Sequence, residues 1–210
     1  MRRILLAAVL IAGGAPAQTE PSSGFDRAVD LARQGQAAAA AALFADLSHV
    51  GNRAAQVNLA VMQARGQGLP QDDQAAAYWA WRARLAGETR AIALSDLLLE
   101  RLTDTARKKL ADRLTADLTA LAELGAHGNF AALGRVEAQL RTPPRLEEAA
   151  VWFTIGAAFE ESGAVPLREV VVGGLDTATR LAVQERAREA FAVWCAKLDS
   201  ASSPATCGAH

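Results

Sequence analysis

Apolar residues extend from Phe25 to Leu198, and charged residues interrupt them every few positions. Ala and Leu dominate this stretch, β-branched residues are sparse, and Gly or Pro breaks the pattern at intervals, which favours helix throughout. The triplet at 170–172 is three valines, but it lies inside a helical pattern, and we interpret it as a buried helix face. The pattern therefore predicts an all-α fold without strands.

An internal repeat is visible as a constant offset of 73 residues between matching positions. The matched positions are Trp79 and Trp152, Pro70 and Pro143, Leu102 and Leu175, Arg107 and Arg180, and the pairs Ala76-Ala77 and Ala149-Ala150. Composition alone does not produce a shared, gapless offset over so many positions. We infer a unit of about 73 residues that is present twice, and repeated helical units of this kind stack on one another.

Each unit divides into two helical hairpins, and one more hairpin precedes them. The predicted hairpins span about 25–48, 51–87, 88–124, 126–163 and 164–199. In the second hairpin, Gly66 and Gly68 permit the backbone conformations that end a helix, and Pro70 prevents the helix from continuing. Asp72 or Asp73 then caps the next helix by accepting hydrogen bonds from its free amide groups.

The segment 55–87 resembles a Sel1 repeat, a tetratricopeptide-like helical hairpin. The matching residues are Leu59, Gly66, Gly68, Asp72, Ala76, Trp79, Arg82, Ala83 and Gly87, with Pro70 in the turn, and Trp152 marks a weaker second copy. Ala60, Gln63 and Leu69 depart from the family pattern. The resemblance implies a right-handed α-solenoid over 25–199. It also implies a role as an adaptor, a regulator or an assembly factor, which are the roles of most Sel1-like proteins.

The N-terminus has the order of a secretory signal peptide: basic Arg2 and Arg3, a short apolar run, then small residues ending at Ala17. The apolar run is shorter than the roughly 20 residues that a membrane-spanning helix needs. We predict cleavage near Ala17, a periplasmic location, no stable membrane insertion, and a disordered linker over 18–24.

Charge and cysteine content limit the kinds of partner, disulfide and metal site that we expect. Without Arg2 and Arg3, 20 basic residues face 23 acidic ones, so the formal charge falls from −1 to about −3, which disfavours nucleic acid as a partner. Cys195 and Cys207 are twelve positions apart, and in an oxidising compartment we expect a disulfide that pins the tail over 200–210. Two unpaired thiols are the alternative. The scattered histidines and two cysteines predict no metal site and no cofactor.

Aromatic residues in the helix after the Gly-x-Gly turn are the first candidates for partner binding. Trp79, like Trp152, shares a helix face with small alanines, and we expect both tryptophans in the core. Tyr78 and Trp81 do not share the face of Trp79, so at least one should lie near the surface, where aromatic residues often dominate binding. Contact with the adjacent hairpin is an equally good explanation.

The arginines nearby suggest a groove. Arg82, Arg84 and Arg90, with Arg65 near the turn, could pair with an acidic segment of a partner, because the guanidinium group holds carboxylates in a bidentate way. A solvated helix face explains the same residues.

No nucleophile with a base, carboxylate pair in an apolar setting or phosphate loop is recognisable, so we expect no catalytic site and no enzyme activity. The sequence predicts a periplasmic interaction module that binds another envelope protein or peptide segment on its concave face. It would serve as a regulator or as an assembly factor of an envelope complex such as a sensor, secretion, cell-wall or flagellar system. A cell-wall-active hydrolase and a self-associating structural protein are the alternatives, and the oligomeric state stays open.

Overall fold

The computed structural model describes residues 23–123, 129–197 and Cys207. The predicted signal peptide, nearly all of the predicted linker and most of the predicted tail lie outside the described residues. Within the described chain every regular element is helical and no strand occurs, which confirms the all-α prediction. No described helix combines the length and apolar content that a membrane crossing requires.

The helix boundaries lie close to the predicted ranges. They are α1 (Gly24–Arg33), α2 (Ala37–His49), α3 (Arg53–Arg65), α4 (Asp73–Leu85), α5 (Ala91–Glu100), α6 (Asp104–Glu123), α7 (Asn129–Arg135), the π-helix η1 (Val136–Leu140), α8 (Leu146–Ala158), α9 (Ala164–Gly173) and α10 (Thr177–Lys197). The predicted linker ends too late at 24, because the Ser23 hydroxyl accepts a hydrogen bond from the Asp26 amide and caps α1 from position 23.

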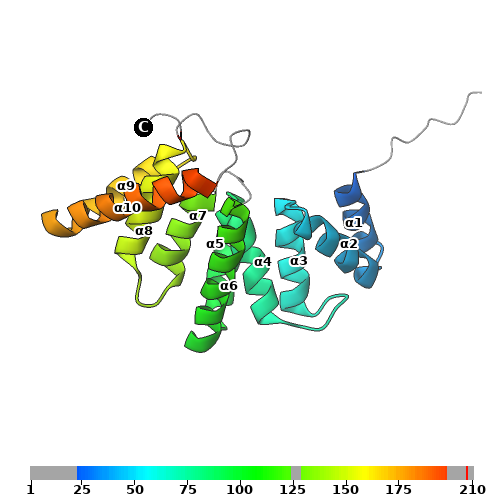
Figure 1. The fold of residues 1–210 in the computed structure, drawn as a ribbon. Coiled ribbons are helices and arrows are strands. Elements are labelled where there is room, and N and C mark those ends of the chain that lie inside the picture. Colours follow the sequence, from blue (N-terminus) through cyan, green and yellow to red (C-terminus); the bar gives the residue numbers. More distant parts are fainter. Residues whose placement is uncertain (1–22, 124–128, 198–206, 208–210) are drawn as a thin grey trace, which may run out of the picture.

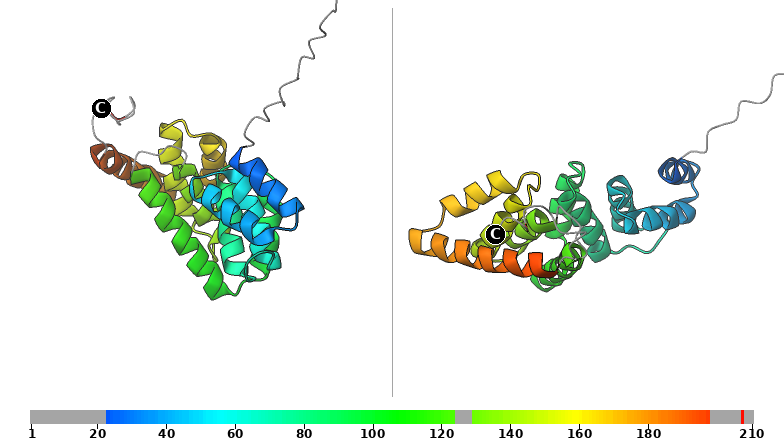
Figure 2. Two further views of the ribbon diagram at one scale, coloured as in Figure 1. Left: turned by 90° about the vertical axis from the view of Figure 1, so that its right-hand side faces the viewer. Right: turned by 45° about the horizontal axis from the view of Figure 1, so that its top comes forward.

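The helices are arranged in chain order from one end of the molecule to the other (Figure 1). The hairpin α1–α2 lies at one end and the pair α9–α10 at the other, and the right-hand view of Figure 2 shows the same elongated arrangement. Contacts are extensive between α1 and α2, α2 and α3, α3 and α4, and α4 and α5. Further along, α7 contacts both α6 and α8, and α8 contacts α9 and α10.

The 73-residue offset reappears in the helix boundaries. The helices α4 and α8 each contain 13 residues and begin 73 positions apart, and α5 and α9 each contain 10 residues with the same offset. The units differ before α8. The first unit has the single helix α3, whereas the second has the seven-residue α7 followed by η1.

The predicted turn between α3 and α4 has the geometry that its glycines allow. Gly66 and Gly68 have φ values of +65° and +79°, in the left-handed region. The Asp72 carboxylate accepts a hydrogen bond of 2.9 Å from the Ala75 amide, so it is the N-cap of α4. Gly68 also lies against the first residues of α2, with no room for a Cβ atom.

Replacing Asp72 with alanine should lower the free energy of unfolding by about 1 kcal/mol, because one amide at the start of α4 loses its acceptor. The neighbouring Asp73 provides a matched control. Its carboxylate lies 3.3 Å from Arg101 in a partly exposed ion pair, so Asp73→Ala should cost under about 1 kcal/mol. Urea denaturation of both variants measures the difference, and equal losses would contradict the assignment of Asp72 as the cap.

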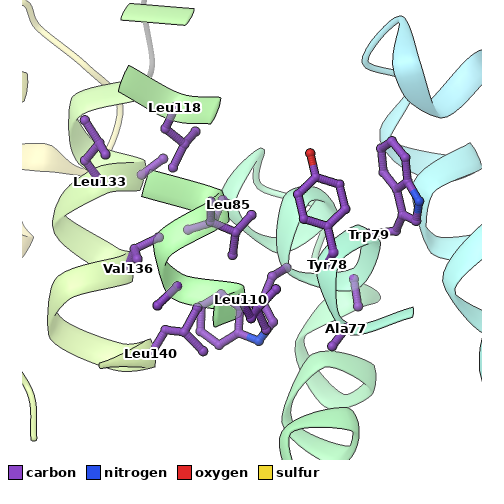
Figure 3. Close-up of a cluster of buried hydrophobic side chains, with 14 of the residues drawn as sticks. Ala77, Tyr78, Trp79, Leu85, Leu110, Leu118, Leu133, Val136 and Leu140 are labelled. Carbon is purple, nitrogen blue, oxygen red and sulfur yellow. The ribbon is translucent and has the colours of Figure 1, made fainter. Parts of the chain in front are cut away.

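Most of α4 is buried in the core. Trp81 is 1% exposed, Trp79 8% and Tyr78 7%, and all three belong to the main hydrophobic cluster. Figure 3 labels Tyr78 and Trp79 within this cluster. The prediction that Trp79 is a core residue is confirmed, and Trp152 is half-buried against the same cluster. The prediction that Tyr78 or Trp81 lies near the surface is wrong, because α3, α5 and α6 all pack against α4.

The valine triplet at 170–172 is helical but is not fully buried. Val170 is 76% exposed, so the prediction of a buried face for the valine triplet is wrong at that position, although the segment is helical as predicted. Leu97, which occupies the equivalent place in α5, is also exposed. Cys195 and Cys207 form the predicted disulfide, with Cα atoms 5.4 Å apart.

Candidate functional site

A pocket of about 540 Å³ lies where the two repeat units meet. Its walls are the first turn of α3, the last turn of α4, the helix α7 and one residue of α6. The lining side chains that carry charge or a polar amide are Arg53, Gln56, Arg82, Asn129 and Arg135. No acidic residue is among those that line the pocket in the described part of the chain. We call this the junction pocket.

Each of the three arginines comes from a different helix. Arg53 is the first residue of α3, directly after the N-cap Asn52, and its Nη1 donates a 2.9 Å hydrogen bond to the Ala86 carbonyl at the end of α4. Arg82 lies one turn before that end, and Arg135 is the last residue of α7. The guanidinium groups are therefore attached to three rigid elements that converge on one space.

Within the described chain, Arg82 and Arg135 have no carboxylate in ion-pair contact. Arg82 and Arg135 are half-buried, yet no described residue forms a hydrogen bond or ion pair with either guanidinium group. Arg53 donates to the Ala86 carbonyl, and its charge contributes to the lowered pKa of the Glu88 carboxyl. A partly desolvated cation without a counter-ion is unfavourable, so the pocket attracts negative charge from outside the described chain.

The polar floor of the pocket repeats between the units. Gln56 and Asn129 are 73 positions apart, and both are buried, with 2% and 9% exposure. The Gln56 Nε2 donates a hydrogen bond to the Ser48 carbonyl at 3.2 Å, which fixes the orientation of its amide. The amide therefore holds the start of α3 against the end of α2.

Glu161 is the acidic residue that secures the far wall. It is 7% exposed, and its two carboxylate oxygens accept hydrogen bonds from the backbone amides of Phe130 (3.2 Å) and Ala131 (2.6 Å). Glu161 is buried although its neighbour Glu160 is exposed. This carboxylate fixes the start of α7 to the connection between α8 and α9, so it positions the wall that carries Arg135.

The arginines predicted from sequence divide between the junction pocket and other places. Arg82 lines the pocket. Arg84 instead binds Asp96 at 2.5 Å and stacks on Trp81, with 4.6 Å between its Cζ and the ring centroid, so it connects α4 to α5. Arg65 is exposed at the opposite end of α3.

Arg90 also has a partner within its own turn. It pairs with Glu88 and lowers the pKa of that carboxyl to about 2, chiefly through the hydrogen bond between the two side chains.

Sequence reasoning therefore identified one pocket arginine, Arg82, and missed Arg53 and Arg135. A usable signal existed for Arg82: the repeat equivalent of this cation, Ile155, is buried and apolar.

Two other hollows have different chemistry. The first, of about 400 Å³, lies beside the start of α6 and contains four cations, among them Arg141, which pairs with Asp112 and Glu137. The second, of about 560 Å³, lies between α1, α2 and α3 and is lined mainly by apolar side chains such as Phe44 and Met62. Of these three hollows, only the junction pocket combines three arginines with no acid among its described lining residues.

Comparison with known proteins does not assign a family. No protein-family model matches the chain, and a search of curated proteins gave no significant relative. Within the described residues no group of His, Cys, Asp and Glu side chains is arranged to hold a metal ion.

Proposed function

We propose that the chain is an exported interaction module, a right-handed Sel1-like solenoid that binds another envelope protein in the periplasm. It would act as a regulator or as an assembly factor of an envelope complex. Three features support the proposal: the signal-peptide pattern at the N-terminus, the Gly-x-Gly turn before α4, and the 73-residue repetition of helix boundaries. Stacked helical units of this kind present extended surfaces on which other proteins bind.

The junction pocket is the observation on which the proposal rests. Stacking the two units requires complementary apolar faces, but it does not require three arginines at the junction. Arg82 and Arg135 also break the repeat, because their equivalents are Ile155 and Met62, both buried and apolar. Internal packing therefore does not account for Arg82 and Arg135, and contact with a partner explains them.

The same pocket bears on the alternative of a cell-wall hydrolase. Glycosidases of the usual kind place two carboxyl groups on either side of the scissile bond. The junction pocket has no carboxylate among its lining residues. An arginine-lined pocket of this composition favours binding over hydrolysis.

A photo-crosslinking experiment tests the proposal. A benzophenone side chain is introduced at Ala86, which is exposed at the rim of the pocket, or at Gln74, which is exposed at the other end of the same helical region. Irradiation of cells should link an envelope protein to the variant at position 86 and not to the variant at 74. Absence of any adduct at 86, or the same adduct at both positions, would remove the support for this surface as the binding site.

A further inference from the structure

We propose that the junction pocket binds the carboxylate side chains of an acidic peptide segment, which the partner protein presents in extended form. This inference rests on the proposed function and names the chemistry of the partner at that site. It follows from the charge of the pocket, from the kind of cation that it contains, and from the mixture of polar and apolar groups in its walls.

The charge is local rather than general. The whole chain has a formal net charge of −1, with 22 basic and 23 acidic residues, yet the pocket contains three arginines and no lining acid. Elsewhere arginines commonly have carboxylate partners in the described chain, as Arg84 does with Asp96 and Arg141 with Asp112. Arg82 and Arg135 have no such carboxylate partner within the described chain, and a ligand can supply one.

All three cations are arginines, although the chain also has lysines at 108, 109 and 197. The guanidinium group is planar and donates two parallel hydrogen bonds, a geometry that matches a carboxylate. Arg53 has its Nη1 committed to the Ala86 carbonyl and can use its remaining donors. Arg82 and Arg135 have all their donors available within the described chain.

The remaining wall groups favour a peptide over a polyphosphate or a nucleic acid. Leu85, Leu118, Ala131 and Ala132 place apolar surface between the cations, where the methylene groups of glutamate side chains can pack. The buried amides of Gln56 and Asn129 form part of the same wall. A nucleic acid is instead recognised through many phosphates along an extended basic surface, and this chain has an acidic excess.

The size of the pocket sets the length of the segment. A volume of about 540 Å³ lies within the range of roughly 300–1,000 Å³ that is usual for ligand sites. It accommodates a few side chains rather than a folded domain. Because the cations come from α3, α4 and α7, a bound segment would contact both repeat units at once.

Fluorescence anisotropy with a labelled hexaglutamate peptide tests the inference on the full mature chain. We expect saturable binding that weakens as salt is added, and no binding of a hexaglutamine peptide. The triple variant Arg53→Gln, Arg82→Gln, Arg135→Gln should lose at least about tenfold in affinity, since each charge-assisted hydrogen bond contributes more than 1 kcal/mol. A control triple variant, Arg27→Gln, Arg180→Gln, Arg188→Gln, removes the same charge from exposed positions and should bind as the parent does.

Two lysine variants distinguish loss of ligand contact from loss of the fold, and polyphosphate tests whether the pocket prefers carboxylates. Arg82→Lys and Arg135→Lys preserve charge and should weaken binding less than the glutamine changes, which distinguishes loss of the ligand contact from loss of the fold, monitored by circular dichroism. Polyphosphate that binds as tightly as hexaglutamate, or equal losses in both triple variants, would overturn the carboxylate assignment. If an envelope protein is crosslinked at position 86 equally well in the parent and in the triple variant of the pocket arginines, this inference is overturned and the proposed function stands. If hexaglutamate binds but no protein is crosslinked at position 86, the carboxylate site is supported and the proposed function is contradicted.

Discussion

Replacing Trp81 with alanine should destabilise the protein by about 3–5 kcal/mol, the usual loss for a buried tryptophan or phenylalanine truncated to alanine. Trp81 is 1% exposed and lies on α4, which contacts α3, α5 and α6. The truncation leaves a cavity that rigid helices on several sides cannot fill. It also removes the ring on which the Arg84 guanidinium stacks. Urea denaturation followed by circular dichroism measures the loss.

Trp152 provides the matched comparison for this experiment. It occupies the equivalent position to Trp79 in the second unit, and it is only half-buried. Trp152→Ala should therefore cost distinctly less than Trp81→Ala, because part of its surface is already in water. A loss at Trp152 equal to that at Trp81 would contradict the central position that we assign to α4.

Replacing Gly68 with alanine should cost on the order of 3–4 kcal/mol, through two effects that add. Gly68 has φ of +79°, which is unfavourable for any residue with a Cβ atom. A Cβ atom at this position would also lie 2.7 Å from the Ala38 amide nitrogen, and closer still to the Ala37 carbonyl. Because these atoms belong to the backbone at the start of α2, they cannot move aside without shifting that helix.

Gly35 separates the two effects. Its φ of +78° is nearly the same, but a Cβ atom there meets no atom within 4 Å. Gly35→Ala should therefore show the conformational effect alone, roughly 1–2 kcal/mol. Thermal and urea unfolding of the two variants measures the difference, which isolates the close approach of the α3–α4 turn to α2. Equal losses in both variants would show that this approach contributes nothing to stability.

The sequence was sufficient for the helices and their order because the signals are local. Gly66, Gly68, Pro70 and Asp72 define one turn and one cap within a few positions, and the structure places the helix ends there. The constant offset of 73 residues also needs no tertiary information, and it matches the boundaries of α4 with α8 and of α5 with α9. The assignment to the Sel1 family stays a prediction.

Burial was harder to predict, because it depends on how many neighbours a helix has. The prediction that Tyr78 or Trp81 is exposed assumed that α4 has one buried face. The segment Ala76–Trp81 contains six apolar residues in succession, which is the pattern of a helix buried all round. At the other extreme, Val170 and Leu97 are apolar but exposed, because the helices α9 and α5 each turn one side to solvent.

The sequence identified Arg82 as a candidate, but it could not show that this residue lines a pocket between the two units. Its residues are spread from Gly51 to Ser162, and only the docking of α7 against α3 and α4 brings them together. Arg84 and Arg82 are two positions apart on one helix, yet one pairs with Asp96 and the other faces the pocket. Which arginine is available for a ligand depends on the elements that surround α4, and these elements come from distant parts of the chain.

The order of the helix contacts has a consequence for how the protein acquires its structure. All of the extensive contacts join elements that are at most two apart along the chain, from α1 with α2 to α8 with α10. Chains dominated by such short-range contacts lose little loop entropy before they gain packing, so they fold quickly for their size. The first helices can therefore pack against one another without waiting for the C-terminal residues. Cys195 and Cys207 would pair last and attach the end of a chain that is already folded.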